Sequence, residues 1–286
     1  MSEEKMIKKI YTGRATIEGA SVRLHRAFGF IEVPIFDPFL MLDDFGSKDP
    51  EDYLAGFPWH PHRGMETVTY MIHGTVDHSD SLGNSGSISD GQVQWMSAGS
   101  GIIHQEMPQL QKDYLRGIQL WVNLPAKNKM MNPRYRDIKA EEIPTVHDEN
   151  GVEVRVIAGI YKNTEGPVKD IICEPEYLDI KIPLEKSFKY FFKKDHTAFV
   201  YLLEGEGYFD SRKEKLAAGQ LGLYGNGEEI EINSISDELR ILCISGKPIR
   251  EPIAWRGPVV MNDDAEITKA FEEYQNGTFI KNIRKN

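Results

Sequence analysis

Histidines and glutamates at two-residue spacing are the residues of this chain best suited to chemistry. His60 and His62 are two positions apart, Glu66 keeps the same parity, and His104 and Glu106 repeat the spacing. Side chains two residues apart on an extended segment leave the same face. Two short extended segments could therefore direct three imidazoles and up to two carboxylates toward one point.

Such a set of donors is typical of a transition-metal site. Imidazole and carboxylate together suit Fe, Mn, Ni, Cu or Zn better than Ca or Mg. No cysteine lies close to these residues in the sequence, which disfavours a thiolate zinc site. Three histidines and one glutamate would leave two positions of a six-coordinate ion open, as in catalytic rather than structural sites. The spacing does not decide between Glu66 and Glu106 as the carboxylate ligand.

Short strands must position these side chains. Residues 66–72 are rich in β-branched and aromatic types, and residues 117–124 alternate between apolar and other side chains. The second half of the chain has further candidate strands at 152–159, 177–182, 197–203, 208–209, 221–224, 229–233 and 239–244. Many short strands separated by Gly and Pro predict an all-β protein built from barrels or sandwiches.

A weak internal repeat relates the two halves of the chain. We expect the polar stretch 128–150 to link them. Residues 67–74 can be aligned with 198–205. We expect the second half to keep the scaffold without the ligands. The alignment places Phe191, Lys193 and Thr197 at the positions of His60, His62 and Glu66. It places Tyr224 and Asn226 near the positions of His104 and Glu106.

The C-terminal stretch predicts a helix. Asn262 or Asp263 can cap it, and Asn276-Gly277 can end it. Its apolar residues follow a helical stripe that we expect to pack on a barrel: Ile267, Ala270, Phe271 and Tyr274.

Composition narrows the class of protein. The net charge of −10 argues against direct nucleic-acid binding, and no apolar run approaches the ~18 residues of a membrane span. Only Cys173 and Cys243 occur, which favours a reducing compartment. We therefore expect a cytoplasmic protein, or a nuclear one if the source is a eukaryote.

Four runs resemble the pirin family of the cupin superfamily: FPWHPHRGMETVTYMIHG (57–74), WMSAGSGIIHQEMP (95–108), IQLWVNLP (118–125) and REPIAWRGPVVMN (250–262). The resemblance implies two tandem cupin-type (double-stranded β-helix) barrels, at 1–135 and 146–254, with residues 255–286 packing back on the first. It implies a metal held by His60, His62, His104 and Glu106, with Glu66 as a base or as a partner of a ligand. The implied metal is divalent Fe, with Mn, Ni, Cu or Zn as alternatives.

The resemblance also implies two functions. One is an oxidoreductase of the quercetin 2,3-dioxygenase type, which opens a flavonol, a small aromatic substrate, with O₂ and releases CO. The other is an iron-containing, redox-responsive interaction protein that contacts a regulatory protein and has no dedicated substrate. The sequence does not separate them, since both would use the same ligands.

Overall fold

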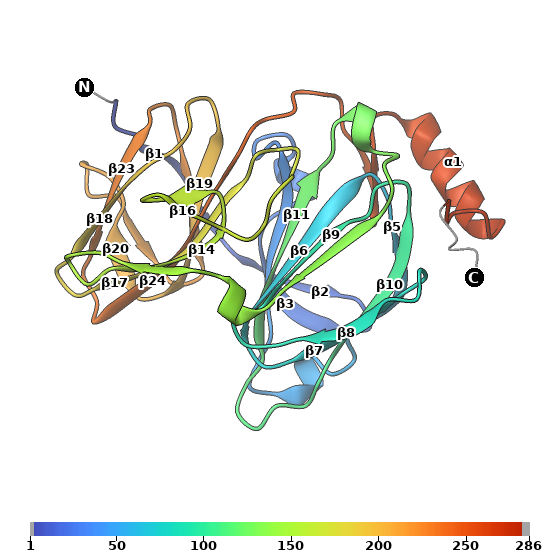
Figure 1. Ribbon diagram of the computed structural model, residues 1–286, viewed down its shortest axis with the longest axis horizontal. Coiled ribbons are helices and arrows are strands. Elements are labelled where there is room, and N and C mark those ends of the chain that lie inside the picture. The colour runs from blue at the N-terminus through green and yellow to red at the C-terminus, as the bar shows by residue number, and fades with distance from the viewer. Residues whose placement is uncertain (1–2, 282–286) are drawn as a thin grey trace. The chain divides into compact units, whose positions relative to one another are not determined.

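The computed structural model describes residues 3–281 (Figure 1). It divides into two compact units, which we call the first unit (residues 15–140 and those from 249 on) and the second unit (residues up to 14 and 141–248). Each unit contains a seven-stranded and a four-stranded sheet, and the strand pairs in these sheets are antiparallel. The predicted all-β class is confirmed.

The first unit contains the strands that carry the candidate ligands. Its four-stranded sheet runs in the order β5 (Phe57–His62), β10 (Ile102–Pro108), β7 (Val76–Asp80) and β8 (Ser85–Ile88). Its seven-stranded sheet runs in the order β12 (Arg134–Ile138), β9 (Val93–Ser97), β6 (Met65–His73), β11 (Arg116–Asn123), β4 (Phe39–Phe45), β3 (Val22–Phe28) and β2 (Arg14–Glu18).

The C-terminal part of the first unit adds a hairpin and a helix. The hairpin pairs β25 (Ala254–Arg256) with β26 (Val259–Met261). Helix α1 (Asp264–Gln275) is capped by the Asp263 side chain, which accepts from the Glu266 N–H, so the predicted start is confirmed. Its buried residues, Ile267 and Ala270, belong to the predicted stripe and pack with Val259, Met261 and Phe279.

The second unit repeats the two-sheet plan. Its large sheet runs in the order β1 (Ile7–Thr12), β22 (Gln220–Tyr224), β19 (Thr197–Glu204), β24 (Glu238–Gly246), β17 (Glu176–Pro183), β14 (Glu153–Ala158) and β13 (Thr145–His147). Its small sheet runs in the order β18 (Ser187–Phe191), β23 (Glu229–Ser234), β20 (Glu206–Tyr208) and β21 (Lys215–Ala217), beside the hairpin of β15 (Ile160–Tyr161) and β16 (Thr164–Glu165).

The N-terminal strand differs from the expected domain limits, which began the first barrel at residue 1. Strand β1 instead pairs antiparallel with β22, from Ile7 opposite Tyr224 to Thr12 opposite Gln220. The edge of β22 presents backbone N–H and C=O groups that require partners, and β1 satisfies them. Sequence spacing carries no information on which sheet edge a terminal strand joins.

The stretch expected to be a linker, 128–150, is partly strand. Strand β12 pairs with β9 of the first unit, and β13 pairs with β14 of the second. The division between units falls after residue 140. Its polar composition hid these strands because both lie at sheet edges, where one side of a strand faces solvent.

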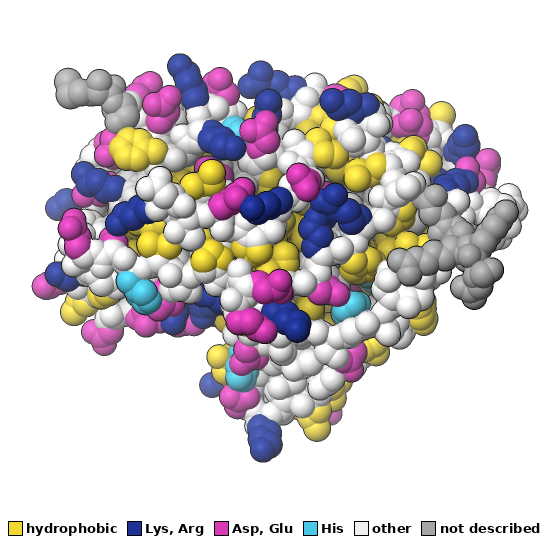
Figure 2. All heavy atoms as spheres, in the orientation of Figure 1, with side chains coloured by type: hydrophobic (Ala, Val, Ile, Leu, Met, Phe, Trp, Pro, Cys, Tyr) yellow, Lys and Arg dark blue, Asp and Glu magenta, His cyan; other side chains and the backbone are white. Residues whose placement is uncertain are grey.

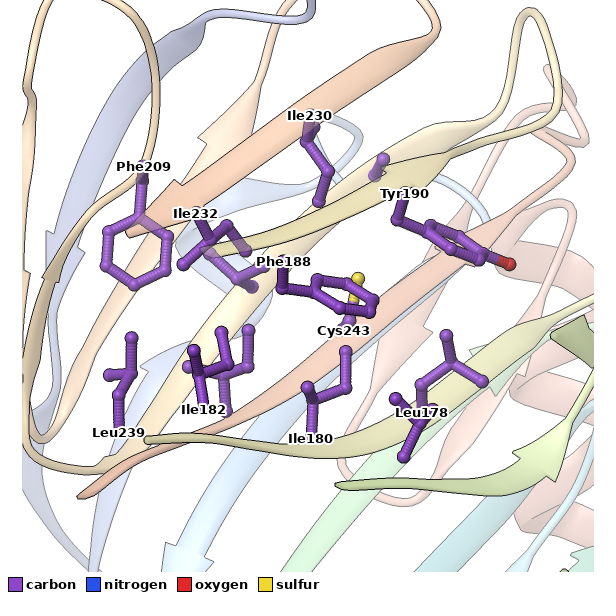
Figure 3. Packing of buried hydrophobic residues seen from close by; sticks show 14 of the residues in the cluster. Leu178, Ile180, Ile182, Phe188, Tyr190, Phe209, Ile230, Ile232, Leu239 and Cys243 are labelled. Carbon is purple, nitrogen blue, oxygen red and sulfur yellow. The ribbon is translucent and has the colours of Figure 1, made fainter. Parts of the chain in front are cut away.

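The interior of the second unit is a continuous apolar core. Phe188 and Tyr190 of β18 meet Ile230 and Ile232 of β23 there, together with Cys243 (Figure 3). In sheet order, β18 and β23 correspond to β5 and β10, and the inward residues of β18 and β23 are apolar where those of β5 and β10 include histidines. Phe191, which the sequence alignment places at the position of His60, is 57% exposed. Tyr224 ends β22, the counterpart of β9, and so does not correspond to His104.

The interior of the first unit is different, because it combines apolar clusters with buried polar side chains. His62, His104, Glu106 and Thr69 are all buried. On the surface, basic and acidic side chains are interspersed over the face shown in Figure 2. Within residues 3–281, no helix has the length and apolar character needed to cross a membrane.

Candidate metal centre

Three imidazoles converge inside the first unit. His60 lies directly opposite His104 in the pairing of β5 with β10, and His62 lies two residues further along β5. The Nε2 atom of His60 is 3.0 Å from Nε2 of His62 and 3.0 Å from Nε2 of His104. These three residues form a group whose ligand atoms lie within 4.8 Å of one another. The predicted meeting of the two clusters is therefore what the fold produces.

Backbone carbonyls orient two of the rings. Nδ1 of His60 is 2.8 Å from the Pro58 carbonyl oxygen, and Nδ1 of His62 is 3.3 Å from that of Pro258. A carbonyl can only accept, so each Nδ1 carries a proton, and the Nε2 of a ring in its neutral form then presents a lone pair. Two lone pairs facing each other at 3.0 Å repel unless a cation lies between them.

The spacing of the nitrogens suits a first-row ion. Two nitrogens about 2.1 Å from one ion, at a right angle to each other, are about 3.0 Å apart. Burial, reinforced by the neighbouring His60 and His104, lowers the pKa of His62 well below its ordinary value. Burial also lowers the pKa of His104 to about 4. Both rings are therefore neutral at pH 7, which is the form that binds a metal, and the group can hold a metal ion.

Glu106 is the carboxylate beside this group. Its Oε2 is 3.9 Å from Nε2 of His104. The Thr69 hydroxyl donates to its Oε1 at 3.1 Å, and Nε2 of Gln119 lies 3.3 and 3.2 Å from the two oxygens. Nε1 of Trp121 donates in turn to Oε1 of Gln119 at 3.0 Å. A chain of hydrogen bonds thus holds the carboxylate in place.

Glu66 lies elsewhere. The Ser97 hydroxyl donates to its Oε1, whereas Oε2 of Glu106 lies 3.9 Å from Nε2 of His104. Glu66 and Thr69 are three residues apart on β6 and so face opposite sides of the sheet, and Thr69 is the one that reaches Glu106. The parity count from His62 to Glu66 does not hold, because Gly64 turns the chain at φ +77° between two strands of different sheets. Burial raises the pKa of Glu66, against the lowering effect of the Ser97 hydrogen bond.

Sequence reasoning missed the supporting residues. The alternation of residues 117–124 predicts a strand but assigns no role to Gln119 and Trp121. In the structure Gln119 donates to Glu106, and Trp121 donates to Gln119. Pro258 lies 196 positions from His62, a separation that no local pattern detects.

A cavity of about 730 Å³ adjoins the histidines, with His60 in its wall. Its aromatic residues include Phe30, Trp121 and Trp255, and its charged residues are Glu18, Arg26, Asp43 and Arg256. The Trp121 ring meets the His62 ring edge-on at 5.1 Å and the Trp255 ring at 5.8 Å. The cavity therefore brings aromatic side chains close to the imidazoles.

The sequence of this chain is similar to those of known proteins. The family model of pirin matches residues 21–122, and that of the pirin C-terminal cupin domain matches residues 177–280. A relative from Caulobacter vibrioides named pirin-like protein is 40% identical over 96% of this chain and 98% of its own.

The chain belongs to the pirin family.

Two further similarities concern activity. A Pseudomonas aeruginosa protein whose name assigns it provisionally to the quercetin 2,3-dioxygenases is 42% identical over 97% of this pirin and 99% of its own length. A crystal structure titled quercetin 2,3-dioxygenase from Acinetobacter baumannii matches with a TM-score of 0.89 and 32% identity, covering 96% of this chain and 98% of that one. The expected fold of two cupin-type domains is thus confirmed.

Proposed function

We propose that this pirin is a metal-dependent dioxygenase of the quercetin 2,3-dioxygenase type. The observation that carries the proposal is the convergence of three Nε2 atoms at the wall of an aromatic cavity. The similarity to proteins bearing that name supports it. His60, His62, His104 and Glu106 are the proposed ligands.

Divalent iron is the metal we propose. Three imidazoles and one carboxylate match its preference for mixed nitrogen and oxygen donors, and Mn, Ni, Cu and Zn accept similar donors. When bound, the ion would supply Lewis acidity toward a substrate hydroxyl and a place for O₂. The choice of iron rests on the likeness to other pirins.

The cavity supports a flavonol as substrate. Its volume lies within the range of small-molecule sites, about 300–1,000 Å³. Trp121, Trp255 and Phe30 can stack on a planar ring system, and Arg26 and Asp43 offer polar contacts to hydroxyl groups. Glu106 is the carboxylate beside the imidazoles. We propose that one of its Oε atoms accepts the proton that the 3-hydroxyl of the flavonol releases. The reaction then adds O₂ to the flavonol and yields the ring-opened ester and CO.

Oxygen uptake and CO release in the presence of quercetin test the proposal. The protein is compared as purified, after removal of metal, and after reloading with Fe²⁺ under anaerobic conditions. We expect turnover that requires metal and is lost in His104→Ala. A fully loaded protein that consumes no O₂ would refute the dioxygenase and favour the redox-responsive interaction protein.

A further inference from the structure

The turn that follows the ligand His62 is held by the C-terminal part of the chain. Arg63 is 2% exposed, and its guanidinium donates to Oε2 of Glu273 at 2.7 Å and to the Phe279 carbonyl oxygen at 2.8 Å. The same guanidinium lies 4.1 Å from the centre of the Phe279 ring. Glu273 belongs to α1 and Phe279 follows it, so one buried cation fastens the helix to the end of β5 (Figure 1).

Backbone contacts extend this attachment to the metal ligand itself. The Val260 N–H donates to the Arg63 carbonyl oxygen at 3.0 Å, and Nζ of Lys129 donates to the carbonyl oxygens of Gly64 and Val260 at 2.9 and 3.0 Å. A Cβ on Gly64 would lie 1.9 Å from the Val260 oxygen, so the two backbones meet without room for a side chain. The Pro258 carbonyl, at the turn of the same hairpin, accepts from His62.

Helix α1 depends on these contacts. It has 12 residues, and isolated helices of about that length are marginal in water. Only Ile267 and Ala270 of the helix are fully buried. The Arg63–Glu273 pair therefore helps to hold the helix. Truncating Glu273 would leave the buried Arg63 charge without its counterion, whereas Glu273 itself also pairs with Lys281 at 2.8 Å.

We propose that α1 and the segment around it are a positioning element of the metal centre, with Arg63 as the positioning residue, so that metal binding and ordering of the helix stabilise each other. The inference rests on the proposed metal site. Coupling between two sites is reciprocal: if the helix favours the orientation of His62 that binds metal, bound metal favours the docked helix. A change at Glu273, which touches no ligand, should then reach the metal.

Glu273→Gln tests the coupling, and Glu272→Gln is the matched control, because Glu272 is an exposed residue next to it on the same helix. The probe is Co²⁺, whose visible absorption reports ligand geometry. Affinity is measured by competition with a chelator, and amide hydrogen exchange of residues 264–275 is measured with and without Co²⁺. Loss of a residue that hydrogen-bonds to a metal ligand weakens metal binding by about 10–100-fold. Glu273 is one contact further from the ligand, so its loss should weaken Co²⁺ binding by ~3–10-fold.

We expect one Co²⁺ per native chain and slower exchange in α1 when it is bound. Glu273→Gln should weaken Co²⁺ binding, alter the absorption band and lose the metal-dependent protection, whereas Glu272→Gln behaves as the native chain. Phe279→Leu, which removes the ring beneath the guanidinium but keeps an apolar side chain, should act in the same direction. Native chain that takes up no Co²⁺ would overturn the metal site. Normal Co²⁺ uptake, with affinity and exchange unchanged in Glu273→Gln, would overturn the coupling alone.

Discussion

Exchanging Glu106 for glutamine is the most informative perturbation of the proposed centre. The substitution keeps the size of the side chain and removes one negative charge beside the three imidazoles. Oε2 of Glu106 lies 3.9 Å from Nε2 of His104, so the carboxylate charge would lie close to an ion bound by that nitrogen. Two unit charges 4 Å apart interact by about 4 kcal/mol at an effective dielectric constant near 20.

Only part of that energy would be lost. The carboxylate is desolvated when it is buried, and the glutamine still offers one neutral oxygen to the ion or to Thr69. We therefore expect Glu106→Gln to weaken metal binding by at least ~10-fold, or about 1.4 kcal/mol, the lower end of the range for losing an outer partner of a ligand.

Glu66→Gln is the matched comparison. Glu66 is also a buried glutamate, but it accepts from Ser97 and lies on the opposite face of β6 from Thr69, the residue that contacts Glu106, so its variant should keep its metal. Metal content of both variants is measured by elemental analysis after dialysis against a weak chelator, and thermal unfolding confirms that both are folded. Metal lost from Glu66→Gln and kept by Glu106→Gln would refute the assignment of the carboxylate.

Three further outcomes are expected. Burial holds the pKa of His104 near 4, below its ordinary 6.5, so as the pH falls the unfolded chain binds a proton on this ring before the folded chain does. The metal-free protein should therefore lose up to about 3 kcal/mol of stability between pH 6.5 and pH 4. The urea midpoint of His104→Gln should fall less than that of the native chain over the same range. Elemental analysis should find one equivalent of metal per native chain and none in the double variant His62→Ala with His104→Ala, because the second unit has Phe188 and Ile232 at the corresponding inward positions; two equivalents would contradict this. Phe188→Ala should cost about 3–5 kcal/mol in urea unfolding while leaving metal content unchanged, and a loss of metal would show that the core of the second unit supports the centre.

The amino-acid sequence alone was sufficient to predict that the histidines converge, and to predict much of the scaffold. The two-residue spacings of His60 with His62 and of His104 with Glu106 on extended segments are local information, because side-chain direction in a strand follows from position alone. The cap and apolar stripe of α1 are equally local, and Asp263 caps the helix as the sequence predicts.

Only the tertiary structure decided what depends on which strands become neighbours. Glu66 and Glu106 are equivalent by spacing, but Glu66 lies on the face of β6 opposite to Thr69, whereas Glu106 accepts from Thr69 and Gln119. The pairing of β1 with β22 joins residues more than 200 positions apart, and the Arg63–Glu273 pair joins positions 210 apart. Such contacts depend on the free energy of the whole packed unit, because unpaired strand edges and buried charges find partners wherever the fold provides them.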